Sequence, residues 1–169
     1  MRVAPTTPVT AGFAVAAYRA EGSWHVEPLP PTVLEDLSVL LAALRSQPQE
    51  GGPFVAAAVD DEFFVMARLT GSRISLMLSD LTAAVEYPLA EQVLERLGED
   101  PPDEDELDEV WPIGDLDVLS DLGISEEEMT EIVDDLDSYP DEMLEEIADR
   151  LDIGDAYLAA VKLAAPARR

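Results

Sequence analysis

The stretch of sequence that decides the fold is residues 54–78, F-V-A-A-A-V-D-D-E-F-F-V-M-A-R-L-T-G-S-R-I-S-L-M-L. Three apolar runs follow one another here, separated by the polar groups D-D-E and T-G-S-R. Because connections this short join only antiparallel neighbours, the runs predict a meander of three strands. The middle run is nearly unbroken, which is typical of a central strand that is covered on both faces. Asp60, Asp61 and Glu62 could serve acid–base chemistry, but we interpret them as the polar residues of a hairpin turn.

A hairpin and a helix precede this meander, and a second helix follows it. Residues 13–18 and 24–27 alternate in polarity as strands do, and E-G-S between them predicts a turn. Leucines recur at helical spacing over residues 34–44. A further helix is predicted to begin at Pro88 and to end at Gly98. The predicted order of elements over residues 12–98 is therefore β-β-α-β-β-β-α.

The second half of the chain is strongly acidic. The net charge is −27, and residues 98–155 hold 25 acids and a single base, Arg150. Prolines and like charges predict a linker at the start of this segment. Beyond it, the sequence predicts a short helix ended by Gly123, a helix that starts at a capping box of Ser125 and Glu128, and a helix that starts near Pro140. The apolar stripe of the helix after Ser125 is predicted to contain Met129, Ile132, Val133 and Leu136.

These patterns predict an α+β fold, in which an antiparallel sheet of about five strands is followed by a small acidic helical region of about three helices. The apolar stripe of each acidic helix must pack on its neighbours or on the first half, and three such helices could share one core. The expected organisation is a flexible N-terminus, a sheet domain, an acidic linker, a helical region and a C-terminal tail, at residues 1–11, 12–98, 99–113, 114–155 and 156–169.

No stretch of the chain predicts a catalytic, metal or cofactor site, and we do not expect an enzyme. Cysteine is absent, so the H-x-E triplet of His25 and Glu27 lacks the two cysteines that a zinc deaminase requires. These two side chains are instead expected to face solvent, on the side of a hairpin strand opposite Trp24. The chain also lacks a G-x-S-x-G elbow and glycine-rich phosphate loops. A calcium loop beginning at Asp135 would place Pro140 where that loop requires glycine.

The acidic segment has three interpretations, namely a solubilising face, a docking surface for a basic partner, and a weak attraction for cations. Direct nucleic-acid binding is not expected, because phosphate contacts need clustered lysine and arginine. The sequence shows no signal-peptide pattern and no apolar run that could span a membrane, which predicts a cytoplasmic protein. The docking interpretation names as candidate contacts Asp103, Glu104, Asp105, Glu106, Asp108, Glu109, Asp134, Asp135, Asp137, Asp141 and Glu142.

Six motifs in a fixed order carry a family resemblance: G-F-A-V-A-A-Y-R-A-E-G-S-W-H-V-E-P-L-P, L-L-A-A-L-R, V-D-D-E-F-F-V, M-L-S-D-L-T-A-A-V-E-Y-P-L-A, D-E-D-E-L-D-E-V and S-Y-P-D-E-M-L. From about residue 12 to about residue 154 the chain resembles the bacterial tRNA adenosine deaminase-associated proteins, a family named for its gene neighbourhood. The resemblance implies a non-catalytic accessory or regulatory protein with the deaminase as its partner. It brings no catalytic or binding residues with it.

Two alternative functions come from other features. The order β-β-α-β-β-β-α is similar, at the level of the fold, to small dimerising scaffold domains of the roadblock and profilin-like sort, which would make the protein an interaction module that forms homodimers. High negative charge is also typical of acidic inhibitors that mimic nucleic acids. Regularly spaced carboxylates on a rigid surface would distinguish the second alternative, and an exposed apolar helix or a self-pairing edge strand would support the first.

Overall fold

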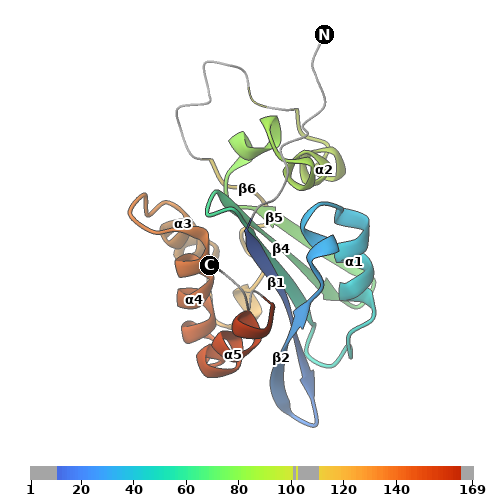
Figure 1. Cartoon of the computed structure of the whole chain (residues 1–169). Helices are drawn as coiled ribbons and strands as arrows, with labels where there is room; N and C mark the ends of the chain where they lie inside the picture. Colours follow the sequence, from blue (N-terminus) through green and yellow to red (C-terminus); the bar gives the residue numbers. More distant parts are fainter. Residues whose placement is uncertain (1–10, 101, 103–110, 165–169) are drawn as a thin grey trace.

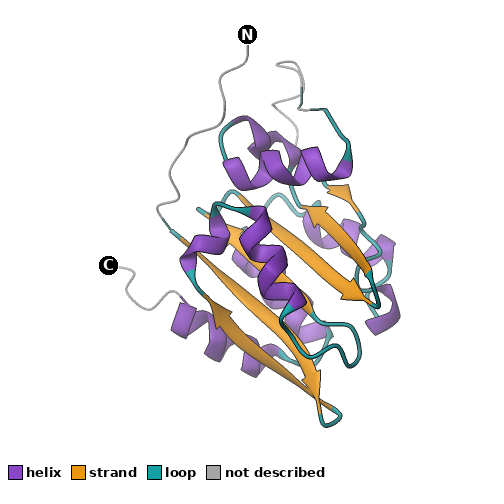
Figure 2. Ribbon diagram, turned by 90° about the vertical axis from the view of Figure 1, so that its right-hand side faces the viewer, coloured by secondary structure: helices purple, strands orange, loops and turns teal. Residues whose placement is uncertain are grey.

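The computed structural model describes residues 11–100, 102 and 111–164, and in this part of the chain a six-stranded antiparallel sheet lies between two layers of helices (Figure 1). The strand order is β2-β1-β3-β4-β5-β6, so the first hairpin lies beside the meander. The predicted α+β class is confirmed, and the described residues contain one strand more than the five expected. Figure 2 shows the long strands crossing the molecule with helices on both sides.

The predicted meander consists of β3 (Phe54–Val59), β4 (Phe63–Thr70) and β5 (Arg73–Leu78). Asp60 and Asp61 lie at its first turn with φ angles of 50° and 57°, in the left-handed region that aspartate tolerates better than most residues. The turn interpretation of these acids is therefore confirmed. β4 is buried along its whole length except at its last residue, because β3 and β5 flank it and helices cover both of its faces.

The predicted hairpin is formed by β1 (Gly12–Ala20) and β2 (Ser23–Leu29), and β2 is an edge of the sheet. His25 and Glu27 are exposed, as expected. Tyr18 lies opposite His25 in the strand register and stacks on it, with 5.3 Å between the ring centroids. The Tyr18 hydroxyl donates to Glu27 Oε1 at 2.9 Å. The H-x-E pair thus belongs to a surface contact within the hairpin.

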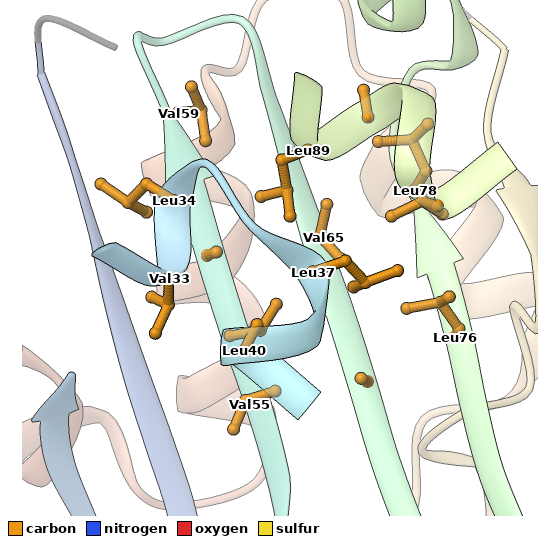
Figure 3. Packing of buried hydrophobic residues seen from close by; sticks show 14 of the residues in the cluster. Val33, Leu34, Leu37, Leu40, Val55, Val59, Val65, Leu76, Leu78 and Leu89 are labelled. Carbon is orange, nitrogen blue, oxygen red and sulfur yellow. The ribbon is translucent and has the colours of Figure 1, made fainter. Parts of the chain in front are cut away.

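The first helical layer covers one face of the sheet with two helices, each preceded by a short 3₁₀ helix. Figure 3 shows Val33, Leu37 and Leu40 lying over Val55 and Val65 of the strands. Their burial explains the leucine spacing seen in the sequence, because every leucine of that pattern points to the sheet. The elements of this layer are η1 (Pro31–Leu34), α1 (Leu37–Arg45), η2 (Leu81–Val85) and α2 (Pro88–Leu97).

The acidic half of the chain forms the second layer, on the opposite face of the sheet (Figure 1). Phe64 and Met66 of β4 share one core with Ile132 and Leu144 of the helices, and Trp24 of β2 packs at its border. The acidic helices therefore complete the core of the sheet. The elements of this layer are η4 (Ser120–Leu122), α3 (Glu126–Val133), α4 (Pro140–Arg150) and α5 (Gly154–Ala164).

The predicted capping box at Ser125 is observed, but the helix that begins there is shorter than its apolar spacing suggested. The Ser125 hydroxyl accepts from Glu128 N at 3.1 Å, and the Glu128 carboxylate accepts from Ser125 N at 3.2 Å, which confirms the capping box. Leu136, which the spacing placed on the apolar face of this helix, lies beyond its end at Val133 and is 80% exposed. The helix ends before Leu136 because the Asp135 carboxylate accepts hydrogen bonds from residues 137 and 138 and so forms a turn.

Two further elements lie where the sequence predicted irregular chain. β6 (Ile113–Gly114) pairs with Met77 and Leu78 of β5, at the end of the expected linker, whose residues 103–110 lie outside the described part. A two-residue strand is too short to show alternation in the sequence. Helix α5 extends to Ala164 over most of the expected C-terminal tail and buries Tyr157 and Ala160. Its alanines gave a weak apolar pattern.

One buried cation joins the sheet to the acidic layer. Arg68 of β4 is 2% exposed, and its guanidinium donates to the carbonyls of Gly51, Gly52 and Val118 at 2.8–3.2 Å. It also forms a two-pronged ion pair with the Asp121 carboxylate, through Nη1 and through Nη2, the latter at 3.0 Å. Arg68 thereby fixes the loop before β3 and the start of the second layer to the central strand.

Candidate partner-docking surface

The candidate contacts that the structure describes gather at one loop. Asp134, Asp135 and Asp137 lie between α3 and α4, Asp141 and Glu142 lie in the first turn of α4, and all five are exposed. The structure brings this group together on the outer side of the second layer (Figure 1). The other predicted group, Asp103, Glu104, Asp105, Glu106, Asp108 and Glu109, lies outside the described residues, so it stays a prediction.

Two of these carboxylates shape the loop that carries the others. Asp135 accepts from the Asp137 amide and from the Ser138 hydroxyl, both at 3.0 Å, which forms the turn after α3. The Glu142 carboxylate accepts from Tyr139 N at 2.9 Å and satisfies an amide at the start of α4. Asp135 and Glu142 are therefore structural residues as well as negative charges. Neutralising them would disturb the loop.

We define the acidic layer surface as residues 126–150, which span α3, the loop and α4. This range holds twelve acids and one base, Arg150. Arg150 donates to Glu128 at 2.8 Å and to Glu146 at 2.7 Å, and so ties α4 to α3. Because both pairs are partly exposed, each stabilises the fold only modestly. Their larger consequence is that the single cation of this surface is already engaged, so the remaining carboxylates are left unneutralised within it.

A groove separates the α3–α4 loop from the neighbouring end of the sheet, and we call it the docking groove. It has a volume of about 190 Å³. Asp61 and Glu62 from the β3–β4 turn and Asp80 after β5 line the sheet side. The helical side and the floor are formed by Val133, Asp135, Leu136, Ser138, Tyr139, Pro140 and Met143. Residues far apart in the sequence thus meet in one concave surface.

The sheet side of the docking groove carries a concentrated negative potential. Burial raises the pKa of Glu62, and the charges of Glu86, Asp80 and the two aspartates before it raise it further. Burial and the Asp60 charge raise the pKa of Tyr87, beside the groove, to about 12. The Glu62 side chain makes no hydrogen bond or ion pair with another described residue. Carboxylates held this close favour the approach of a cation.

Two large side chains at the rim of the groove are unusually exposed. Leu136 is 80% exposed and Tyr139 is 60% exposed, although both lie next to the buried side chains of Val133 and Met143. Exposed apolar groups beside a hollow, rimmed by polar groups, are typical of protein interaction sites. The groove therefore offers an apolar contact and several carboxylates in the same place.

Sequence reasoning missed the sheet side of this groove. Asp61 and Glu62 gave the signal of a hairpin turn, which is correct, but nothing in their neighbourhood indicated that the α3–α4 loop lies beside them. Leu136 was assigned to a buried stripe because its spacing from Val133 fits a helix. The available signal was the D-S-Y-P sequence after Leu136, since proline and aspartate are typical of a chain that leaves one helix and begins another.

The described part of the chain does not assemble a metal centre. No group of three or more histidine and carboxylate side chains that could hold a metal ion occurs among these residues. No helix of the described part is long and apolar enough to cross a membrane.

Comparison with known proteins places the chain in a family. The model of the family described as Rv3753c-like tRNA adenosine deaminase-associated protein matches residues 12–154. Protein Rv3753c of Mycobacterium tuberculosis (strain ATCC 25618 / H37Rv) is 38% identical over 159 residues, which cover 93% of this chain and 91% of that protein. No solved structure matches the chain. The family match covers the sheet, the first helical layer, and α3 and α4 with the loop between them, so the chain belongs to the Rv3753c-like family of tRNA adenosine deaminase-associated proteins.

Proposed function

We propose that this protein is a non-catalytic, cytoplasmic accessory protein that docks its acidic layer surface on a basic protein, and that the tRNA adenosine deaminase is this partner. The observation that supports docking is the unneutralised charge of residues 126–150, in which the single base is engaged by Glu128 and Glu146. The family description supports the choice of the partner.

The charge favours a protein partner over the RNA itself. A surface with one base among thirteen charged residues repels phosphates and attracts a patch of arginine and lysine. Such complementarity raises the rate of association and falls with added salt, since exposed charges are screened beyond about 8–10 Å at 0.1–0.15 M salt. An accessory protein of this kind either competes with tRNA for a basic surface of the enzyme or stabilises the enzyme from another face.

The test is co-purification with the deaminase of the same organism by size exclusion, at about 50 mM and about 500 mM salt. The proposal expects a complex at low salt that is weakened at high salt. The docking variant replaces Asp134, Asp137 and Asp141 by asparagine, because these acids are not the ones that form the turn and the cap. A matched control carries Glu95→Gln, Glu99→Gln and Asp100→Asn, which are exposed at the end of α2 and after it.

The docking variant should weaken the complex and the control variant should leave it unchanged. A second variant, with the six acids of residues 103–109 replaced by their amides, tests the other predicted group. If the deaminase elutes separately at both salt concentrations, the proposed partner is wrong. If the complex forms but ignores salt and both acidic variants, the partner is right and the acidic docking is wrong.

A second candidate function, a homodimerising interaction module, is favoured by one observation. β2 is an edge strand, and α5, which packs beside it, exposes Leu158 by 41% and Leu163 by 69%. An unpaired strand edge and exposed apolar side chains are typical features of a dimer interface. Against this, Pro28 and the charged side chain of Glu27 in β2 disfavour pairing of this edge with another strand. Analytical ultracentrifugation at about 1 and about 100 μM would detect the dimer expected from this candidate.

A further inference from the structure

We propose that the docking groove binds one short segment of a partner protein, in which a large apolar side chain is flanked by arginine or lysine residues. The inference deepens the proposed function and rests on it only for the existence of a basic protein partner. To the proposed function it adds the location of the binding site and the type of segment that the site recognises. The groove is built from the β3–β4 turn, the end of β5 and the α3–α4 loop, and so is distinct from a diffuse acidic face.

The apolar part of the rule follows from the rim and the floor. Leu136 and Tyr139 stand on the rim with most of their surface in water, and Val133 and Met143 beneath them are 1% and 8% exposed. A side chain that enters between them would bury its own surface together with that of both rim residues. Leu136 and Tyr139 lie between α3 and α4, where the carboxylates of Asp135 and Glu142 accept hydrogen bonds from backbone amides. The apolar contact is thus presented by a defined turn.

The basic part of the rule follows from the carboxylates that border the same hollow. Asp61, Glu62 and Asp80 line one side and Asp135 lines the other, and the lining contains no lysine, arginine or histidine from the part of the chain that the structure describes. The hollow that adjoins it shares Glu62 and Asp80 and adds Glu86 together with Val85, which is 42% exposed. A purely apolar segment would remove these carboxylates from water without pairing them, which is unfavourable. A basic residue on each side of the apolar anchor would form ion pairs with the carboxylates on both sides of the groove.

Charge also decides against two other occupants. A second copy of this chain would bring a net charge of −27 to an acidic groove, so its approach is repelled. RNA is repelled for the same reason, because its phosphates meet carboxylates. A basic protein segment is the occupant that matches the groove in charge and in apolar content. Recognition of short segments by a few anchors in a groove is an established mode of peptide binding.

The groove can be tested without the deaminase by a small set of synthetic peptides. The probes are nonapeptides of sequence G-R-R-G-X-G-R-R-G with leucine, phenylalanine, alanine or serine at X, and counterparts in which glutamine replaces every arginine. Binding to the full chain is measured by fluorescence anisotropy and by the NMR shifts of the Leu136 methyls and the Tyr139 ring. The leucine and phenylalanine peptides are expected to bind at least about ten-fold more tightly than the serine peptide. Their affinity should fall at least about ten-fold when glutamine replaces the arginines.

Variants of the groove and of matched surface positions locate the binding. Leu136→Ser and Tyr139→Ser should abolish the preference for leucine over serine at X, whereas Leu163→Ser on α5, 69% exposed, should leave it unchanged. Asp61→Asn with Glu62→Gln should weaken the arginine peptides by about ten-fold. The double variant Asp61→Asn with Glu62→Gln leaves the apolar rim unchanged, so it tests the groove even if a serine variant does not fold. Circular dichroism would show whether each variant is folded.

The outcomes separate the groove from the proposed partner. If the peptides bind with the expected preferences but the deaminase does not bind, the groove is established and the proposed partner is wrong. The opposite result has two parts: the deaminase complex forms even with Leu136→Ser and Tyr139→Ser, and the peptides show no preference at X. In that case the partner is established and the groove proposal is wrong. Failure of every peptide to bind, or shifts that avoid Leu136 and Tyr139, overturns the groove proposal.

Discussion

Replacing Asp121 by asparagine is expected to lower the free energy of unfolding by about 1–2 kcal/mol at pH 7. Hydrogen bonds to charged groups contribute roughly 1.5–3 kcal/mol, and Asp121 pairs with a guanidinium that is 2% exposed. The Asp121 side chain itself is 64% exposed, so solvent screening reduces the upper part of that range. In a domain of this size the change corresponds to a fall in Tm of about 2–8 °C.

The cost of Asp121→Asn should depend on pH in a defined direction. The hydrogen bonds and the charge of Arg68 hold the pKa of Asp121 below its ordinary value of 3.8. A carboxyl group whose pKa is lowered by folding stabilises the native state above its unfolded pKa and loses that contribution as pH falls through the folded pKa. The difference between the wild type and the variant should therefore be full at pH 7 and should shrink below about pH 3.8.

The assay is urea unfolding followed by tryptophan fluorescence, at pH 7 and at about pH 3, with two controls. Asp117→Asn removes an exposed carboxylate from the same segment and should change the free energy of unfolding by less than about 0.5 kcal/mol. Arg68→Met should cost about 3–5 kcal/mol, because it leaves the carbonyls of Gly52 and Val118 without their donor. Equal stabilities of Asp121→Asn and Asp117→Asn at pH 7, or a cost that persists unchanged at pH 3, would refute the reasoning.

Three further substitutions test other parts of the structure. Glu62→Gln should raise the free energy of unfolding by up to about 0.5 kcal/mol at pH 7, because folding raises the pKa of this carboxyl; the gain should vanish below its ordinary pKa of 4.5, as urea unfolding at both pH values can show. Gly52→Ala should cost about 1–3 kcal/mol, because φ is 78° and the added Cβ would lie 2.7 Å from Arg68 Nη2; calorimetry measures the fall in Tm. Ser125→Ala should cost about 1 kcal/mol and speed amide hydrogen exchange in the first turn of α3, and unchanged exchange would contradict the capping role.

The elements that the sequence predicted well are those with a local chemical signal. The Asp60–Asp61 turn, the helix start at Pro88, the glycine stop at Gly98 and the capping box at Ser125 each depend on residues within a few positions of one another. The unbroken β4 run also predicted a strand covered on both faces, and the acidic half proved to supply the second cover. β6 and α5 were missed because two residues show no period and alanines show a weak one.

The candidate site was predicted only in part because it is made of distant segments. Asp134, Asp135, Asp137, Asp141 and Glu142 could be named from charge alone, and they lie exposed in the α3–α4 loop and in the first turn of α4. Their position next to the β3–β4 turn depends on how the second layer seats on the sheet. The Arg68–Asp121 pair that helps to fix this seating joins residues 53 positions apart. Periodicity and turn chemistry carry no information about such a pair.

The burial of the sheet on both faces has a consequence for how the chain folds during its synthesis. Strands β1 to β5 and the first layer are complete once Leu97 has been made, but the second face of the sheet is covered only after α3, α4 and α5 have been made. At roughly 5–20 residues per second, the chain between Leu78 and Tyr157 takes about 4–16 s to make. During that interval Phe64, Met66 and Met77 have no native cover. The acidic segment that arrives meanwhile keeps the nascent chain strongly charged, and so repels other chains until the apolar face is closed.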